Sequence, residues 1–166
     1  SAFHVGTSGW SYKHWREIFY PRELKTGQWF EFYAQQFDCV ELNTSFYHLP
    51  QAAQNNRFAL EARHESWLCD AALALLEKYR VAFVIAESGG KFPYAEIVTT
   101  DFVYLRFHGP NAQTLYAAKY SRAQLQHCAR LGKQWLAEGR DVWAFFNNDI
   151  GGHAFRNARE LKEMVE

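Results

Sequence analysis

Short apolar runs rich in β-branched and aromatic residues alternate along this chain with segments of helical periodicity. The run 81–85 is continuously apolar, as expected of a strand covered on both faces. Leu68, Ala71, Leu75 and Tyr79 repeat at helical spacing. This alternation favours a parallel α/β sheet or barrel. The expected strands span 3–7, 39–43, 58–62, 81–85, 102–107 and 142–146, and the expected helices span 29–37, 66–79, 121–138 and 153–165.

Size and composition are those of one globular domain, which we expect to span residues 1–166. Apolar residues make up 48% of the chain, which argues against disorder. The 18 basic and 18 acidic residues cancel, so no long-range field attracts nucleic-acid phosphates or anionic lipid. Nucleic acid is therefore not an expected partner, and the composition does not indicate an oligomeric state.

The cysteines and the apolar runs indicate the cellular compartment of the protein. Cys39, Cys69 and Cys128 are odd in number and form no C-x-x-C pair, which favours buried, reduced thiols. The first twenty residues contain no apolar core of a signal peptide, and the run 81–86 is too short to cross a bilayer. We expect a cytoplasmic protein that does not associate with membranes.

The connection between the second and third expected strands is unusually short. A crossover between parallel strands needs about a dozen residues or more, usually with a helix. Residues 46–57 barely reach that length, and 50–56 carry no amphipathic period. Either these two strands pair antiparallel, or chain is missing between them.

Polar side chains stand where four of the expected strands end. The carboxyl ends of parallel strands meet at one edge of a sheet, where the sites of such folds form. Alternate residues of a strand share a face, which sorts these side chains into groups. The groups are Glu41 with Asn43, Glu61 with Arg63, Arg106 with His108, and Asn147 with Asp149.

Three of these residues are candidate catalytic groups. Glu41 and Glu61, buried side by side, would share one proton and supply an acid and a base. His108 is a candidate proton shuttle. The alternative is structural: each carboxylate pairs with Arg63 or Arg106 and holds the strand ends together, because buried charges must be paired.

The remaining candidates describe a ligand. Arg63 and Arg106 suit a bidentate grip on a phosphate or carboxylate. Aromatic walls and hydrogen-bonding groups would complete a site for a small, polar, anionic or sugar-like molecule. The further ligand-binding candidates are Trp10, Tyr12, Asn43, Tyr47, His64 and Asn147.

A metal site is an alternative that the spacing does not favour. His64 and His108 with Glu41, Glu61 or Glu87 would supply nitrogen and oxygen ligands for a divalent metal. No H-x-x-x-H or C-x-x-C spacing supports this. We assign no metal ligand and no cofactor.

Seven motifs carry a family resemblance. They are GTSGWSY at 6–12, FYP at 19–21, VELNTSFY at 40–47, EARHESW at 61–67, YLRFHG at 104–109, FNN at 146–148 and NA at 157–158. In this order they resemble the YecE-like family, a domain of unknown function (DUF72). The resemblance implies a TIM (β/α)₈ barrel whose biochemical activity is not established.

The chain departs from that family after Pro50. Family members carry two further strand–helix units before the strand that ends in Glu61, and these contribute a lysine and a Thr–His pair to the presumed pocket. Residues 50–57 replace them here. A closed barrel usually needs at least about 200 residues. We therefore expect an incomplete barrel of about six strands, with a segment missing or deleted after Pro50.

Three functions are consistent with these features. The first is an enzyme that performs acid/base chemistry on a small polar ligand through Glu41, Glu61 and His108. The second is a non-catalytic module that binds a metabolite or nucleic acid. The third is a metal-dependent phosphoester hydrolase.

Overall fold

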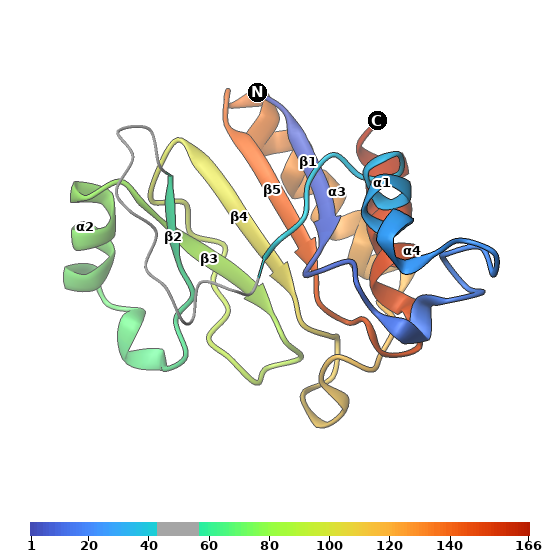
Figure 1. Ribbon diagram of the computed structural model, residues 1–166. Coiled ribbons are helices and arrows are strands. Elements are labelled where there is room, and N and C mark those ends of the chain that lie inside the picture. Colours follow the sequence, from blue (N-terminus) through green and yellow to red (C-terminus); the bar gives the residue numbers. More distant parts are fainter. Residues whose placement is uncertain (43–56) are drawn as a thin grey trace.

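The computed structural model describes residues 1–42 and 57–166, which contain a five-stranded parallel sheet with helices packed on it (Figure 1). The strand order is β1-β5-β4-β3-β2, and every ladder is parallel. Parallel strands agree with the alternation of strands and helices in the sequence. The strands are β1 (Phe3–Thr7), β2 (Phe58–Leu60), β3 (Val81–Glu87), β4 (Phe102–Phe107) and β5 (Asp141–Phe146).

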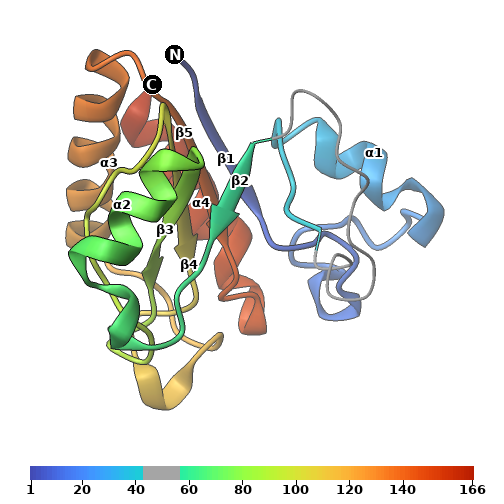
Figure 2. The same cartoon turned by 90° about the vertical axis from the view of Figure 1, so that its left-hand side faces the viewer.

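Helices α2 and α3 lie side by side over the sheet, whereas α1 lies beyond its β1 edge (Figure 2), where the Tyr33 hydroxyl accepts the Thr7 N–H over 2.9 Å. Helix α2 packs on β3, α3 packs on β5 and α4, and α4 packs on β1 and β5. The helices are α1 (Trp29–Ala34), α2 (Asp70–Lys78), α3 (Arg122–Ala137) and α4 (His153–Val165).

The two faces of the sheet differ in chemistry because side chains alternate along each strand. Tyr104 is in register with Val84 and Trp143, and all three line a cavity on what we call the inner face. Leu105 is in register with Ile85, and both are buried on the opposite, outer face under the helices.

The expected strand 39–43 is reduced to a single bridge in the described part of the chain. Glu41 forms a parallel bridge with Ser8, beyond the end of β1. Two glycines shape this contact. A Cβ on Gly6 would lie 2.2 Å from the Cys39 carbonyl oxygen, and Gly9, at φ 88°, turns the chain away after the bridge. The described residues thus contain five strands rather than about six.

The sheet is open, and its two edges come from the segments that flank the short connection. Glu41 lies beside β1 at one edge, whereas β2 forms the other edge and pairs in parallel with β3. The suggestion that these two segments pair antiparallel is therefore wrong. An open parallel sheet agrees with the expectation of an incomplete barrel.

Two helix starts illustrate what local sequence determines. Helix α3 begins after Ser121, which forms the expected capping box with Gln124. Helix α2 begins at Asp70 rather than Ser66, because the His64 side chain accepts the Ser66 N–H and holds a separate 3₁₀ turn over Glu65–Trp67.

The cysteine and membrane expectations can be compared with the structure directly. All three cysteines are free thiols, but Cys69 is exposed, contrary to the expectation of buried thiols. Its position before Asp70, the first residue of α2, explains this exposure. Within 1–42 and 57–166, no helix combines the length and the hydropathy needed to cross a membrane.

Candidate functional site

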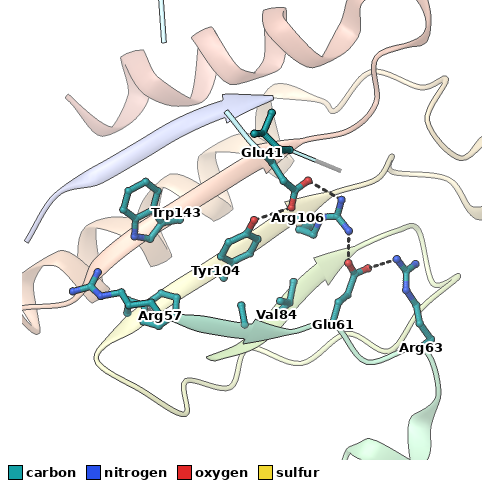
Figure 3. Close-up of a pocket in the computed structure, with 11 residues that line it drawn as sticks. Glu41, Arg57, Glu61, Arg63, Val84, Tyr104, Arg106 and Trp143 are labelled. Carbon is teal, nitrogen blue, oxygen red and sulfur yellow. Dashed lines mark hydrogen bonds and ion pairs between the residues drawn. The ribbon is translucent and has the colours of Figure 1, made fainter. Parts of the chain in front are cut away.

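Arg106 is the centre of a network of charged side chains at the carboxyl ends of the strands (Figure 3). It extends from β4 on the inner face, and 12% of its side chain is exposed. Its Nη2 donates to Glu41 Oε2 over 2.7 Å, and its Nη1 donates to Glu61 Oε2 over 2.5 Å. One guanidinium therefore joins two carboxylates from distant parts of the sequence.

Glu41 is held by its backbone and by its side chain. Its N–H donates to the Thr7 carbonyl over 3.1 Å, and its own carbonyl accepts the Gly9 N–H over 2.9 Å. The Tyr104 hydroxyl donates to Oε1 over 2.7 Å, and the Ser8 hydroxyl donates to Oε2. Two neutral hydroxyl groups thus share this carboxylate with the guanidinium.

Glu61 is bound by a buried histidine. His108 is 1% exposed, and its Nε2–H donates to Glu61 Oε1 over 2.8 Å. The Asn147 amide nitrogen donates to His108 Nδ1 over 3.2 Å. With Nδ1 accepting, the proton of a neutral imidazole lies on Nε2, where it faces the carboxylate.

Arg63 adds a second guanidinium to Glu61. Its Nη2 lies 3.2 Å from Glu61 Oε1, and its guanidinium carbon lies 4.0 Å from the centre of the Phe92 ring. Since 47% of the Arg63 side chain is exposed, this group remains accessible to a ligand, unlike Arg106.

These contacts determine the protonation states of Glu61 and Tyr104. Burial alone would raise the pKa of Glu61, but hydrogen bonds from His108 and Arg106 and the charge of Arg106 outweigh it and lower this pKa to about 2. Burial and the Glu41 charge raise the pKa of Tyr104 far above its ordinary value, so its hydroxyl remains a donor. The guanidinium between the carboxylates favours structural pairing over a proton shared by Glu41 and Glu61.

The network also shows that the sheet is curved. Between the Glu41 segment and β4 lie β1 and β5, a separation of roughly 14 Å across a flat sheet. Nevertheless Glu41 and Arg106 are hydrogen bonded. The inner face is therefore concave, as in part of a barrel wall.

A cavity of about 650 Å³ lies on this concave face. Its volume falls within the range of small-molecule sites. The two carboxylates, Arg63 and Arg106 occupy its strand-end side, Arg57 lies at the opposite end, and aromatic side chains line its floor (Figure 3). The lining residues are Glu41, Leu42, Arg57, Ala59, Glu61, Arg63, Val84, Phe102, Tyr104, Arg106 and Trp143.

Comparison with known families identifies the fold that carries this network. A family model described as "Protein of unknown function DUF72" matches residues 4–59 and 51–166. The chain belongs to the DUF72 family. The expected resemblance to the YecE-like family is thereby confirmed. No curated protein matched the sequence.

Two solved DUF72 structures are similar to this one. The crystal structure of a DUF72 family protein from Thermotoga maritima MSB8 is 22% identical, with a TM-score of 0.78 over 99% of both chains. Another from Enterococcus faecalis V583 is 21% identical, with a TM-score of 0.60 over 68% of this chain and 48% of that one. At these identities the likeness concerns the fold.

The family match consists of two stretches of the chain. They overlap at residues 51–59, next to the break expected after Pro50.

The structure brings together most of the candidates from this DUF72 sequence. Glu41, Glu61, Arg63 and Arg106 line the cavity, and His108 contacts Glu61 behind it. The expected hydrogen-bonding amide of Asn147 contacts His108 instead of lining the cavity. The candidates Asn43 and Tyr47 lie outside the described residues.

Three candidates lie away from the cavity. Trp10 packs against the main core beside Phe30, with ring centres 4.9 Å apart. The Tyr12 hydroxyl donates to the Ser8 carbonyl, and burial, then the charges of Asp149 and Glu41, raise its pKa to about 12. His64 is exposed and caps its own 3₁₀ turn. Their positions follow from local packing, which motif reading does not resolve.

Tyr104 and Ser8 were not among the candidates, although both donate to Glu41. The signal for Tyr104 was available, since it precedes Arg106 by two residues on one strand and must share its face. Ser8 follows β1 directly in the loop GTSGWSY, but its partnership with Glu41 depends on a contact between distant segments.

The positions of the candidate metal ligands can also be compared with the structure. In the part of the chain that the structure describes, no group of three or more His, Cys, Asp or Glu side chains is arranged to hold a metal ion. His64 and His108 do not meet, since His64 bonds Ser66 and His108 bonds Glu61.

Proposed function

We propose that this DUF72 protein binds a small polar ligand in the inner cavity and exchanges a proton with it through Glu41. The observation that carries the proposal is the unequal bonding of the two cavity carboxylates. Glu61 faces three nitrogen groups, from Arg63, Arg106 and His108. With a pKa of about 2 it is a weak base near neutral pH, where a general base is most effective with a pKa close to that pH.

Glu41 differs because two of its three donors are neutral hydroxyls, from Ser8 and Tyr104. A hydroxyl can rotate and accept a hydrogen bond when the carboxylate takes up a proton, whereas a guanidinium cannot. Of the two cavity carboxylates, Glu41 is therefore the one with partners that can rearrange when a ligand exchanges a proton with it. In this role Glu61 and His108 are positioning residues that keep Arg106 in place.

The cavity favours a ligand with both a polar and a flat apolar face. Trp143 and Tyr104 offer ring faces of the kind that pack against sugar rings. The partly exposed Arg63 is the candidate partner for an anionic group, because both terminal nitrogens of Arg106 are already bonded. Sugar phosphates and hydroxy acids combine these features.

Hydrogen–deuterium exchange of ligand C–H groups tests the proposal without knowledge of the product. A panel of sugar phosphates, hydroxy acids and keto acids is incubated with the protein in D₂O and followed by proton NMR. We expect loss of one ligand C–H signal with the wild type and with Glu23→Gln, an exposed control, but not with Glu41→Gln. Undiminished exchange by a folded Glu41→Gln variant would sink the assignment.

A non-catalytic binding module is the second candidate. It is favoured by the direct bonding of Arg106 to Glu61, since such a network can shape a pocket without transferring protons. Ligand binding that survives Glu41→Gln but is lost in Arg106→Ala, with no C–H exchange in the wild type, would support this function instead.

A further inference from the structure

A second cavity lies on the opposite side of the sheet from the candidate site. Its volume is about 310 Å³, and it separates the outer face of β3 and β4 from helix α3. Figure 2 shows α2 and α3 side by side on this face of the sheet. The lining residues are Ile85, Glu87, Tyr94, Leu105, Phe107, Tyr120, Ala123, Gln124, His127, Cys128, Leu131 and Trp135.

The cavity follows from an irregularity in the alternation of strands and helices. Strand β3 is followed by β4 with no helix between them in the described chain. An extended stretch takes the place of the helix. Ala95 and Ile97 pack with the residues under α2, whereas the Tyr94 hydroxyl and His127 of α3 both bond Glu96. This single stretch of chain covers less of the sheet than a helix would, and a cavity therefore remains beside α3.

Glu87 is the one carboxylate among the lining residues, which are mostly apolar or aromatic and also include Gln124 and His127. Glu87 is the last residue of β3 and points to the outer face, since it lies two residues beyond Ile85. Its Oε1 accepts the Gly89 N–H over 2.9 Å. Among the residues that the structure describes, Glu87 has no cationic partner. A partly buried carboxylate without a counter-charge is costly, and a bound cation would offset that cost.

The surroundings of the Cys128 thiol also indicate that this cavity attracts a positively charged ligand. Burial, and then the negative charges of Glu87 and Glu96, raise the pKa of Cys128 to about 12. An anion placed here would meet the same two charges, whereas a cation would be attracted. The aromatic residues Phe107, Tyr120 and Trp135 also line the cavity, and aromatic rings attract cations through their π faces.

We propose that this outer cavity is a second binding site, selective for a small organic amine whose ammonium group pairs with Glu87 and whose aromatic or branched apolar body fills the hollow under α3. The size fits: cavities of about 150 Å³ hold a benzene ring, so this one holds a substituted ring with a short side chain. The site is separate from the inner cavity and does not depend on the proposed function.

Calorimetric titration with three matched probes tests this site. The probes are 2-phenylethylamine, 2-phenylethanol and 3-phenylpropionate, which share a phenyl body and carry a positive, neutral or negative end. We expect the amine to bind best, the alcohol more weakly and the acid not measurably. In Glu87→Gln the affinity for the amine should fall about tenfold or more, because a charge-assisted hydrogen bond is lost, while the affinity for the alcohol should hardly change.

Two further variants complete the design. Ala123→Trp places a bulky ring at an exposed position of α3 that lines the cavity, and it should block both the amine and the alcohol. Glu77→Gln removes an exposed carboxylate from α2 and should leave binding unchanged. No binding of the amine to the wild type at millimolar concentration overturns the proposal. So does equal affinity in the wild type and Glu87→Gln, or amide NMR shifts confined to the inner cavity.

Discussion

Glu61 shows how strongly a single side chain can depend on its neighbours. Only 11% of its side chain is exposed, and burial alone would favour its protonated form. His108 and Arg106 reverse that preference by bonding the ionised carboxylate. The ionised form of Glu61 is therefore stabilised in the folded protein relative to the unfolded chain, which links folding to pH.

We predict that Glu61 makes the protein sensitive to acid in a defined pH window. Its pKa falls from 4.5 to about 2 on folding, so the stabilisation is fully present above about pH 4.5 and is lost as the pH falls toward 2. The full effect is on the order of 3 kcal/mol. Urea unfolding from pH 6 to pH 2.5 measures it. Glu61→Gln should be less stable at pH 6 but lose less on acidification; parallel pH curves would contradict the assignment.

At the level of single residues, the sequence predicted which side chains lie close together. It did not predict how they are bonded to one another. Strand parity and the strand-end rule placed Glu61, Arg106 and His108 in one cluster. The same rules do not show that Arg106 stands between two carboxylates. That arrangement depends on the curvature of the sheet, which arises from packing across strands and leaves no periodic signal in the sequence.

At the level of elements, the segment 39–42 matters more for the site than its single bridge suggests. It carries Glu41 to the cavity and is held against β1 by close backbone contact at Gly6. The Cys39 carbonyl also accepts the Tyr33 hydroxyl over 3.0 Å, which ties the segment to α1. The position of Glu41 is thus determined by the packing of a loop on a strand.

We predict that Gly6→Ala destabilises the protein and displaces Glu41. The new methyl carbon would lie 2.2 Å from the Cys39 carbonyl oxygen, so the segment must move away from β1. Such overpacking costs about 1–3 kcal/mol. Gly27→Ala is the matched control, because a Cβ there meets nothing within 4 Å. Thermal and urea unfolding of both variants provide the measurement, and equal stability of the two would show that the contact is not tight.

Element boundaries were predictable where the signal is local. The capping box of Ser121 and Gln124 is complete within four residues, and α3 begins where it indicates. Ser66 supplies only the cap residue of such a box, since Cys69 stands three residues later, and the Ser66 N–H is already bonded by the His64 side chain. The helix then starts at Asp70. A competing hydrogen bond to a neighbouring side chain is a detail that hydrophobic spacing does not record.

At the level of the whole molecule, stability is expected to vary across the sheet. Strands β4 and β5 have a neighbour on both sides, whereas β2 is a three-residue edge strand with Phe58 52% exposed. Buried central strands open with the global unfolding free energy, and thin edges open locally.

We therefore predict a gradient of amide hydrogen exchange across the sheet. Amides of β4 and β5 should exchange slowest and those of β2 several orders of magnitude faster, because less structure must open to expose them. Exchange measured by mass spectrometry at peptide resolution reports this order. Protection of β2 equal to that of β4 would indicate that the open edge is covered in solution.

The class of the global architecture was predictable, but the strand order was not. Alternating strands and helices indicated parallel pairing, and the short connection after Pro50 indicated an incomplete barrel; the described sheet is parallel and open. The strand order required the structure, because the pairing of β1 with β5 joins Phe3 to Val142, residues that no local pattern relates.

That pairing has a consequence for how the protein is made. Strand β1 is the first of the five described strands to be synthesised, whereas its ladder partner β5 is the last. At ordinary elongation rates of about 5–20 residues per second, β1 waits several seconds or more with its edge unpaired. The described sheet is thus completed only after its last strand has been translated, and β1 can then carry the Glu41 segment into reach of Arg106.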